Sequence, residues 1–96
     1  MENQHRKIVG YHELTQEDID LMNQIKEVGR ELLHLQETVV KRNKDYADNL
    51  YFTPGSVPEL DRLEAAEPAR WAAIARTDIQ TGVMALVRAV AQPTDC

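Results

Sequence analysis

The sequence lacks the residues and segments on which several classes of protein depend. Its one cysteine is Cys96, so no disulfide can form within the chain, which fits a reducing cytosol. The spacing of cysteine and histidine typical of a zinc site is missing as well. No run of about 18 apolar residues is present, so no membrane-spanning helix is predicted. Residues 1–7 are polar and contain no apolar core of a signal peptide.

Negative charge outweighs positive charge in this sequence, and the 96 residues carry a net charge of −5. A protein that binds nucleic-acid polymers without regard to sequence needs a basic field to release counterions, so this class is disfavoured. A small phosphate ligand is still compatible, since a few Arg or Lys side chains can bind it. With 43% apolar and 28% charged residues, the composition and length are those of one ordinary folded domain.

The apolar pattern predicts a first long helix over residues 15–48. Thr15 suits the N-cap, and Asp18 stands where a capping box carries Glu or Gln. Apolar residues then recur at alternating steps of four and three, which is the pattern of a heptad seam. This first seam consists of Leu21, Ile25, Val28, Leu32, Leu35 and Val39.

Residues 49–66 are predicted to form a loop, because Pro54 and Gly55 signal a turn. A short helical turn is expected within this segment, over residues 59–67. We expect the adjacent aromatic residues Tyr51 and Phe52 to pin the loop to a helix surface.

A second long helix is predicted over residues 67–91. Pro68 suits its first position, and Pro93 prevents its continuation. The sequence shows neither an internal repeat nor β-type alternation. We therefore predict an all-α fold, an antiparallel helical hairpin with a short N-terminal arm, in a single domain over residues 1–96.

Both predicted helices carry more apolar surface than a hairpin can bury. A second stripe on the first helix consists of Met22, Lys26, Gly29, Leu33, Gln36 and Val40. The second helix carries apolar and small residues around most of its circumference. A hairpin of two helices buries one stripe on each, and soluble monomers avoid large exposed apolar patches. We therefore predict a homo-oligomer of helical hairpins.

Lys26 is a candidate ligand-binding residue because it lies in the second apolar stripe, between Met22 and Gly29. Arg30 follows four residues later, so both cations share one face of the helix. A cation in an apolar groove beside a glycine suits a phosphate or the plane of a base. The alternative is a lysine whose stem lies along the surface and whose charge pairs with Glu27.

Tyr11 and Arg76 are further candidates. Tyr11 precedes the first helix beside Gly10, where an aromatic ring can stack on a nucleobase or can clamp the start of the helix. Arg76 falls within an apolar seam of the second helix and, with Thr77 and Gln80, can offer donors to a phosphate. Ion pairing between subunits, with acidic residues of the first helix, is the alternative.

No catalytic arrangement is recognisable. His5, His12 and His34 are scattered and have no carboxylate or cysteine partner at metal-ligand spacing. A nucleophile elbow, a P-loop, a pair of carboxylates and a Ser/His/Asp set are all missing. We expect a protein that is not an enzyme and uses neither metal nor cofactor.

Two stretches resemble the hairpin domain shared by phage anti-CBASS and anti-Thoeris sponges. The first is GYHELT at residues 10–15, followed by IKE at 25–27 and by Gly29. The second is RWAAIARTDIQTGVMALVRAVA at residues 70–91. The resemblance covers about residues 8–92, which is nearly the whole chain.

The resemblance implies a homohexamer that sequesters cyclic oligonucleotide messengers in the cytoplasm of the infected bacterium and deprives the CBASS effector of its signal. The ligands are cyclic dinucleotides at subunit interfaces and, in some members, cyclic trinucleotides at a separate site; no cleavage, membrane or nucleic-acid polymer is involved. The family's site aromatic matches Tyr11, and its site lysine matches Lys26. Helix geometry adds Arg30, and Arg70 is where we look for a trinucleotide site.

Three other functions compete with the anti-CBASS sponge. The anti-Thoeris branch captures a cyclised ADP-ribose signal but usually carries sequence beyond the hairpin, and this chain is barely longer than the hairpin. A coiled-coil adaptor that binds a protein accounts for the heptads equally well but not for Lys26 and Arg76 within apolar stripes. A weak phosphodiesterase lacks metal ligands and an acid–base pair.

Overall fold

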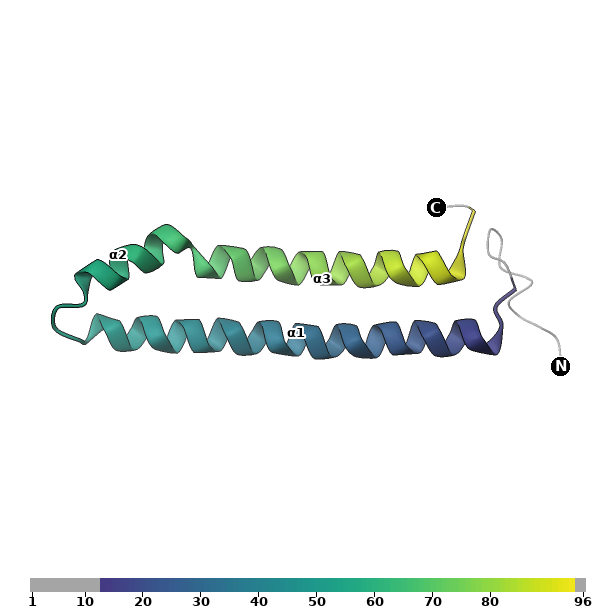
Figure 1. The fold of residues 1–96 in the computed structure, drawn as a ribbon, viewed down its shortest axis with the longest axis horizontal. Coiled ribbons are helices and arrows are strands. Elements are labelled where there is room, and N and C mark those ends of the chain that lie inside the picture. The colour runs from purple at the N-terminus through teal and green to yellow at the C-terminus, as the bar shows by residue number, and fades with distance from the viewer. Residues whose placement is uncertain (1–12, 95–96) are drawn as a thin grey trace. The chain divides into compact units, whose positions relative to one another are not determined.

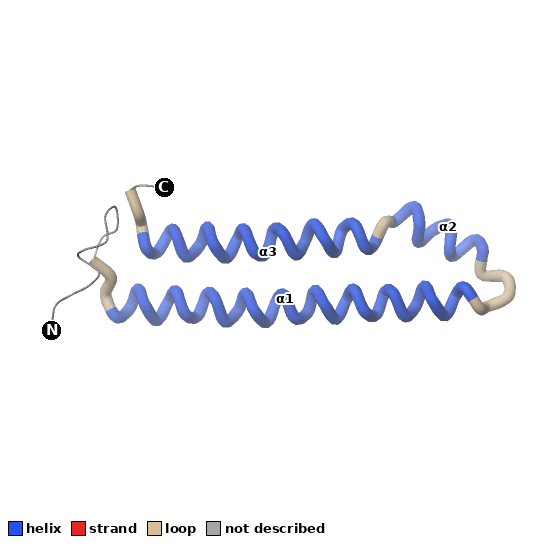
Figure 2. The backbone as a smooth tube through the Cα atoms, turned by 180° about the vertical axis from the view of Figure 1, so that it is seen from behind, coloured by secondary structure: helices blue, strands red, loops and turns tan. Residues whose placement is uncertain are grey.

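The computed structural model describes residues 13–94, and this part of the chain is helical. It contains α1 (Gln16–Tyr51), α2 (Val57–Ala66) and α3 (Pro68–Ala91), in that order (Figure 1). Helices and loops account for the whole described segment, which contains no strand (Figure 2). The prediction of an all-α fold is therefore confirmed for these residues. No helix in this segment combines the length and apolar character needed to cross a membrane.

The chain divides into two compact units, each built from segments that are distant in the sequence. Unit 1 combines residues up to Arg30 with those from Gln80 onward, so the start of α1 packs with the end of α3. Unit 2 covers Glu31–Ile79, where the rest of α1 packs with α2 and the start of α3. Within each unit, the α1 and α3 segments run in opposite directions (Figure 1).

A reciprocal pair of hydrogen bonds holds the start of α1. The backbone N–H of Thr15 donates to Oδ2 of Asp18 at 3.0 Å, and the backbone N–H of Asp18 donates to Oγ1 of Thr15 at 3.1 Å. This is a capping box in which Asp takes the place of Glu or Gln. The predicted N-cap is therefore confirmed.

The segment after α1 differs from its prediction in two respects. α1 continues to Tyr51 instead of ending at residue 48, and the predicted loop over residues 49–66 contains the ten-residue helix α2. Gly55, at a φ of 77°, makes the turn between these helices. The hydroxyl of buried Ser56 then donates to the carbonyl of Leu50 at 2.6 Å, so the end of α1 is joined to the start of α2.

The expectation that Tyr51 and Phe52 pin this segment to a helix is wrong. Their side chains are 78% and 87% exposed, and their rings instead meet each other edge to face, with centroids 6.4 Å apart. The contact with the helix is made by Ser56, a small polar residue, because its hydroxyl reaches the carbonyl of Leu50 at the helix end, which also accepts the N–H of Thr53 at 3.0 Å.

α2 and α3 are separated by a single residue. Glu67 adopts a left-handed conformation at a φ of 51°, and its N–H donates to the carbonyl of Leu63 at 3.0 Å, which ends α2. Pro68 then begins α3, as predicted. At the other end, α3 stops at Ala91, and Gln92 turns the chain at a φ of 53° before Pro93.

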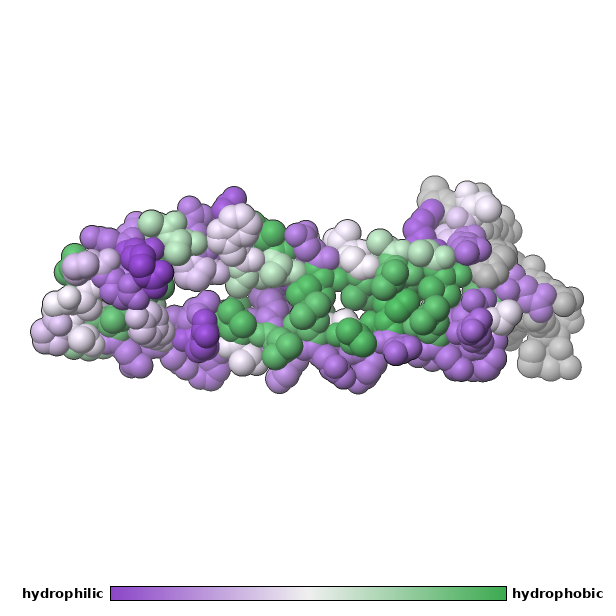
Figure 3. Space-filling view, in the orientation of Figure 1, coloured by the Kyte–Doolittle hydropathy of each residue, from purple (hydrophilic) through white to green (hydrophobic). Residues whose placement is uncertain are grey.

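The stripe of α1 that faces inward is the one centred on Gly29. Gly29 is buried, and Met22, Leu33 and Gln36 are partly buried. The first seam is left outside apart from partly buried Ile25, and its exposed members are Leu21, Val28, Leu32, Leu35 and Val39, at 43–58% exposure. Figure 3 shows apolar side chains gathered on the visible face of the segment where α1 begins and α3 ends. Of the stripe around Gly29, Lys26 and Val40 are exposed and the other four members face inward at least in part, while most of the first seam remains uncovered.

Gly29 allows α1 and α3 to approach each other within unit 1. A Cβ atom at Gly29 would lie 2.6 Å from Cγ2 of Val83, whereas a Cβ at Gly82 would meet nothing within 4 Å. We expect Gly29→Ala to destabilise the fold by about 1 kcal/mol, because the stiff valine must move and this outweighs the gain in helix propensity. The matched change Gly82→Ala should stabilise it by about 0.5–1 kcal/mol. Urea unfolding monitored by circular dichroism measures both, and equal stabilisation by the two changes would show that Val83 yields freely.

Candidate functional site

Lys26 and Arg30 lie one turn apart on the α1 segment of unit 1. Both side chains are exposed. Nη2 of Arg30 lies 2.5 Å from Oε2 of Glu27, so the charge of Arg30 is already paired within the helix. Across residues 13–94, by contrast, Lys26 has no carboxylate within ion-pair distance. Of the two neighbouring cations, Lys26 is therefore the one whose charge is available to a ligand.

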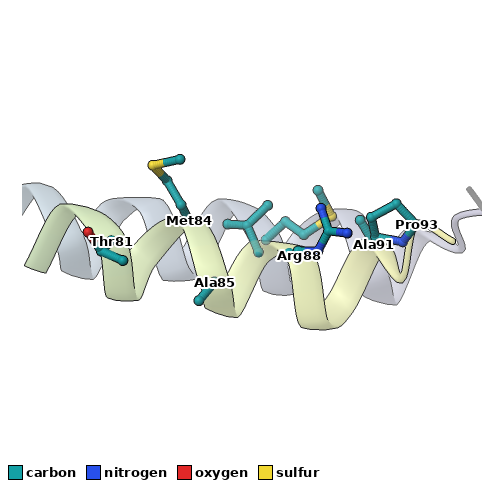
Figure 4. Close-up of a pocket in the computed structure, with 8 residues that line it drawn as sticks. Thr81, Met84, Ala85, Arg88, Ala91 and Pro93 are labelled. Atoms are coloured by element: carbon teal, nitrogen blue, oxygen red, sulfur yellow. The ribbon is translucent and has the colours of Figure 1, made fainter. Parts of the chain in front are cut away.

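A groove of about 460 Å³ lies in the same unit, between the start of α1 and the end of α3. Figure 4 shows its lining side chains, most of them along α3. They are Met22, Thr81, Met84, Ala85, Val87, Arg88, Ala91 and Pro93. Met22 is one turn before Lys26, so it places one wall of the groove on the same face of α1 as that lysine. The groove offers apolar walls with one hydroxyl and one guanidinium group.

Met84 and Thr81 belong to this groove but are not singled out as site residues by the sequence. Met84 is 71% exposed, although it lies on an apolar stripe that, read from the sequence, belongs in a helical core. Its exposure depends on which face of α3 packs against α1, and periodicity alone does not decide this. Tyr11, the predicted stacking residue, lies outside the described residues.

Arg76 lies in unit 2 and belongs to a polar cluster between α1 and α3. Its Nη1 lies 3.4 Å from Oε1 of Gln36 and 3.6 Å from Oε2 of Glu37. The amide of Gln36 also donates to the backbone carbonyl of Ala72 at 2.9 Å. The structure thus pairs Arg76 with an acid of α1 in its own chain, whereas the ion pair expected from the sequence was one between subunits. This cluster joins α1 to α3 by polar contacts beside buried Ala72.

Arg70, also in unit 2, lies over an aromatic ring. Its guanidinium carbon is 5.1 Å from the centroid of the Trp71 ring, and its Nη1 is 3.4 Å from Oε2 of Glu67. Trp71 is 59% exposed. Trp71, which the sequence analysis did not select, therefore presents a flat aromatic surface beside a cation, a combination that can stack a base and meet a phosphate.

The predicted site residues form two groups. Lys26 and Arg30 belong to unit 1, near the groove, whereas Arg70 and Arg76 belong to unit 2. Within unit 2, Arg70 and Arg76 make contacts with different neighbours, so the structure does not gather them around one ligand. Among residues 13–94, no group of three or more histidine, cysteine, aspartate or glutamate side chains is placed to hold a metal ion.

A second polar cluster in unit 2 joins α1 to α2 and centres on Glu59. Its carboxylate accepts hydrogen bonds from Nε and Nη2 of Arg62, at 2.6 and 2.9 Å, and from the hydroxyl of Tyr46 at 2.6 Å. The bonds from Arg62, followed by that from Tyr46, lower the pKa of Glu59 from 4.5 to about 2. The same contact with Glu59 raises the pKa of Tyr46. Glu59 is therefore held ionised and fixes both neighbours.

This cluster makes the free energy of unfolding depend on pH in the acid range. Because the pKa of Glu59 is about 2 in the folded chain and returns toward 4.5 on unfolding, its stabilising effect is complete above about pH 5. It is lost as the pH falls from 4.5 toward 2. We expect Glu59→Gln to flatten this part of the pH profile in urea unfolding. Glu64→Gln, an exposed change on the same helix, is the control and should keep the parent profile; equal profiles for both variants would contradict this role of Glu59.

Comparisons with known proteins agree on one family. The profile of the Acb2/Tad1 hairpin domain matches residues 3–91. A curated relative, Anti-CBASS protein 2 of Pseudomonas phage JBD67, is 58% identical over 108 aligned positions, which cover the whole of both chains. The match includes the segments that carry Lys26, Arg30, Arg70 and Arg76.

Proposed function

Because this chain belongs to the Acb2/Tad1 hairpin family, we propose that it is a phage anti-defence protein that binds cyclic oligonucleotide messengers and holds them without cleaving them. By removing the messenger in the cytoplasm of the infected host, it prevents activation of the CBASS effector. The observation that carries this proposal is the full-length 58% identity to a protein named for its anti-CBASS activity.

The surroundings of Lys26 support this assignment. Its ammonium group has no carboxylate partner among residues 13–94, and it lies one turn from the apolar groove that contains Met22. Both features suit a nucleotide, because its phosphate can pair with the cation and its base can pack against the apolar wall. Tyr11 supplies the stacking ring in this proposal, and Arg30 adds a second cation when it leaves Glu27.

The proposal includes a homo-oligomer, a hexamer by family resemblance, in which ligands bind between subunits. The exposed apolar residues of the α1 seam support it, because a second copy that covers them removes a large apolar area from water. A cyclic trinucleotide site is proposed at Arg70, where the exposed ring of Trp71 lies beside the guanidinium group.

Titration calorimetry of the full-length protein with a cyclic dinucleotide, and separately with a cyclic trinucleotide, tests the function. We expect saturable binding and, after denaturation of the protein, chromatographic recovery of intact ligand. Recovery of linear product would replace the sponge with a phosphodiesterase. Absence of heat with both ligands, followed by binding of a cyclised ADP-ribose, would move the protein to the other branch. If none of these ligands binds or shifts the thermal midpoint, the adaptor hypothesis takes over.

A further inference from the structure

Most cations of the described chain are paired with neighbouring carboxylates, and Arg42, like Lys26, is an exception. Carboxylates pair with Arg30, Lys41, Lys44, Arg62, Arg70 and Arg76. Nη2 of Arg42 instead donates to the neutral Oδ1 of Asn43 at 3.0 Å. No carboxylate within residues 13–94 lies at ion-pair distance from it. Arg42 thus keeps a full positive charge in a protein whose net charge is −5.

Arg42 lines a pocket of about 350 Å³ within unit 2, together with Asn43 and Tyr46 of α1 and Arg62 of α2. Arg62 is fixed there by Glu59, which binds its Nε and Nη2 atoms and leaves Nη1. The hydroxyl of Tyr46 is fixed by the same carboxylate. The guanidinium groups of Arg42 and Arg62 therefore border one pocket, and that of Arg62 is held in place by Glu59.

The hydrogen-bonding groups at this pocket are unbalanced in favour of donors. Glu59 is engaged by Arg62 and Tyr46, and Oδ1 of Asn43 is engaged by Arg42. The remaining groups are N–H donors: those of Arg42, Nη1 of Arg62 and the amide NH2 of Asn43. With two arginines against one glutamate, the cluster also keeps an excess of positive charge. These properties suit an oxyanion.

We propose that this pocket is a phosphate-binding site, separate from the site at Lys26, which takes the phosphate group of a small molecule. A phosphate presents more acceptor oxygens than a carboxylate, so it can bond both guanidinium groups and the amide of Asn43 at once. The pocket leaves room beyond the phosphate for a small attached group. Glu59 is a positioning residue, because it orients Arg62 without contacting the anion.

Nuclear magnetic resonance of the full-length protein, titrated with inorganic phosphate, tests the proposal. We expect saturable shifts of the Nε–H resonances of Arg42 and Arg62 and of the side-chain amide of Asn43. Arg42→Gln should weaken phosphate binding by about tenfold or more. Lys41→Gln is the matched control, since it removes an equal charge from the adjacent residue, whose ammonium is paired with Asp45, and should leave binding unchanged.

A second variant tests how the site is built. Glu59→Gln should also weaken phosphate binding, because Arg62 is no longer held, and Glu64→Gln should not. The source of the phosphate is distinguished by repeating the titration with a nucleoside monophosphate and with a cyclic dinucleotide in competition with inorganic phosphate. Displacement by the first indicates a phosphate monoester, and displacement by the second indicates that the cyclic ligand reaches this site.

Three results would overturn the proposal. The first is the lack of a saturable phosphate response, and the second is an equal loss of binding in Lys41→Gln and Arg42→Gln, which would reduce the effect to general charge. The third is a change in oligomer mass in Arg42→Gln, which would assign this arginine to a carboxylate of a second copy. Lys26→Ala separates this proposal from the sponge function, because it should abolish capture of the cyclic dinucleotide but preserve the phosphate shifts at Arg42.

Discussion

Lys26→Ala is expected to abolish capture of a cyclic dinucleotide, with an affinity loss of about 100-fold or more. The physical reason is that its ammonium group has no carboxylate partner among residues 13–94, and that Lys26 follows Met22, a residue of the apolar groove, by one turn of α1. A cation that meets a phosphate beside an apolar wall is partly removed from water, so its interaction is stronger than that of a fully solvated charge. Titration calorimetry measures the loss.

Lys41→Ala is the matched control for this experiment. Lys41 lies on the same helix, but its ammonium group is held 2.9 Å from the carboxylate of Asp45, so its removal should leave affinity at the parent value. Tyr11→Ala should resemble Lys26→Ala if the two residues form one site. The mass of the oligomer should be unchanged in all three variants. Parent-like binding by both Lys26→Ala and Tyr11→Ala would show that the site lies elsewhere.

The double substitution Leu32→Glu with Leu35→Glu is expected to dissociate the oligomer. Both leucines are exposed, at 46% and 58%, and they belong to the seam that the fold of one chain leaves uncovered. If a second copy covers them, each glutamate buries an uncompensated charge at the interface, and the cost exceeds about 2 kcal/mol per position. Light scattering should show loss of the assembled species across a range of protein concentrations.

Because the core of a single chain is small, with Ala72 and Ala91 as the buried hydrophobic residues among those described, dissociation should also lower helicity. Circular dichroism measures this effect at the same concentrations. Asn23→Glu, an exposed change on the face of α1 away from the seam, adds one negative charge where each leucine substitution adds one, and should preserve both mass and helicity. A double variant that keeps the parent's mass and thermal midpoint would show that the seam is not an interface.

The local signals in the sequence predicted much of the fold because each acts over a few neighbouring residues. Thr15 and Asp18 form their cap within one turn, and Pro68 begins α3 where its missing N–H carries no penalty. α2 was expected only as a short helical turn over residues 59–67, because Pro54 and Gly55 dominate the local pattern, and its start at Val57 was not predicted. Its start also depends on Ser56, whose hydroxyl reaches back to the carbonyl of Leu50, the end of a different helix.

The candidate site was predicted less completely. Lys26 was singled out because a cation in an apolar stripe is visible in the sequence, and its motif matches the family. Trp71 and Arg42 were missed, because neither exposure nor the lack of a carboxylate partner can be read from spacing. Arg76 was expected within a seam but is exposed, and its contact with Gln36, 40 residues away in the sequence, depends on how α1 and α3 align.

By itself, the sequence determined that the chain is helical, where its long helices begin, that they carry more apolar surface than one hairpin buries, and which family the chain belongs to. The helical properties follow from adjacent residues and from periodicity, whereas the family follows from the resemblance of residues 10–15, 25–29 and 70–91 to its hairpin domain. Only the tertiary structure decided which stripe of α1 faces inward. Gly29 determines which stripe this is, because a residue without a Cβ lets Val83 of α3 approach. This contact joins positions far apart in the chain. The same packing leaves most of the first seam and Lys26 exposed, where a partner subunit and a ligand can reach them.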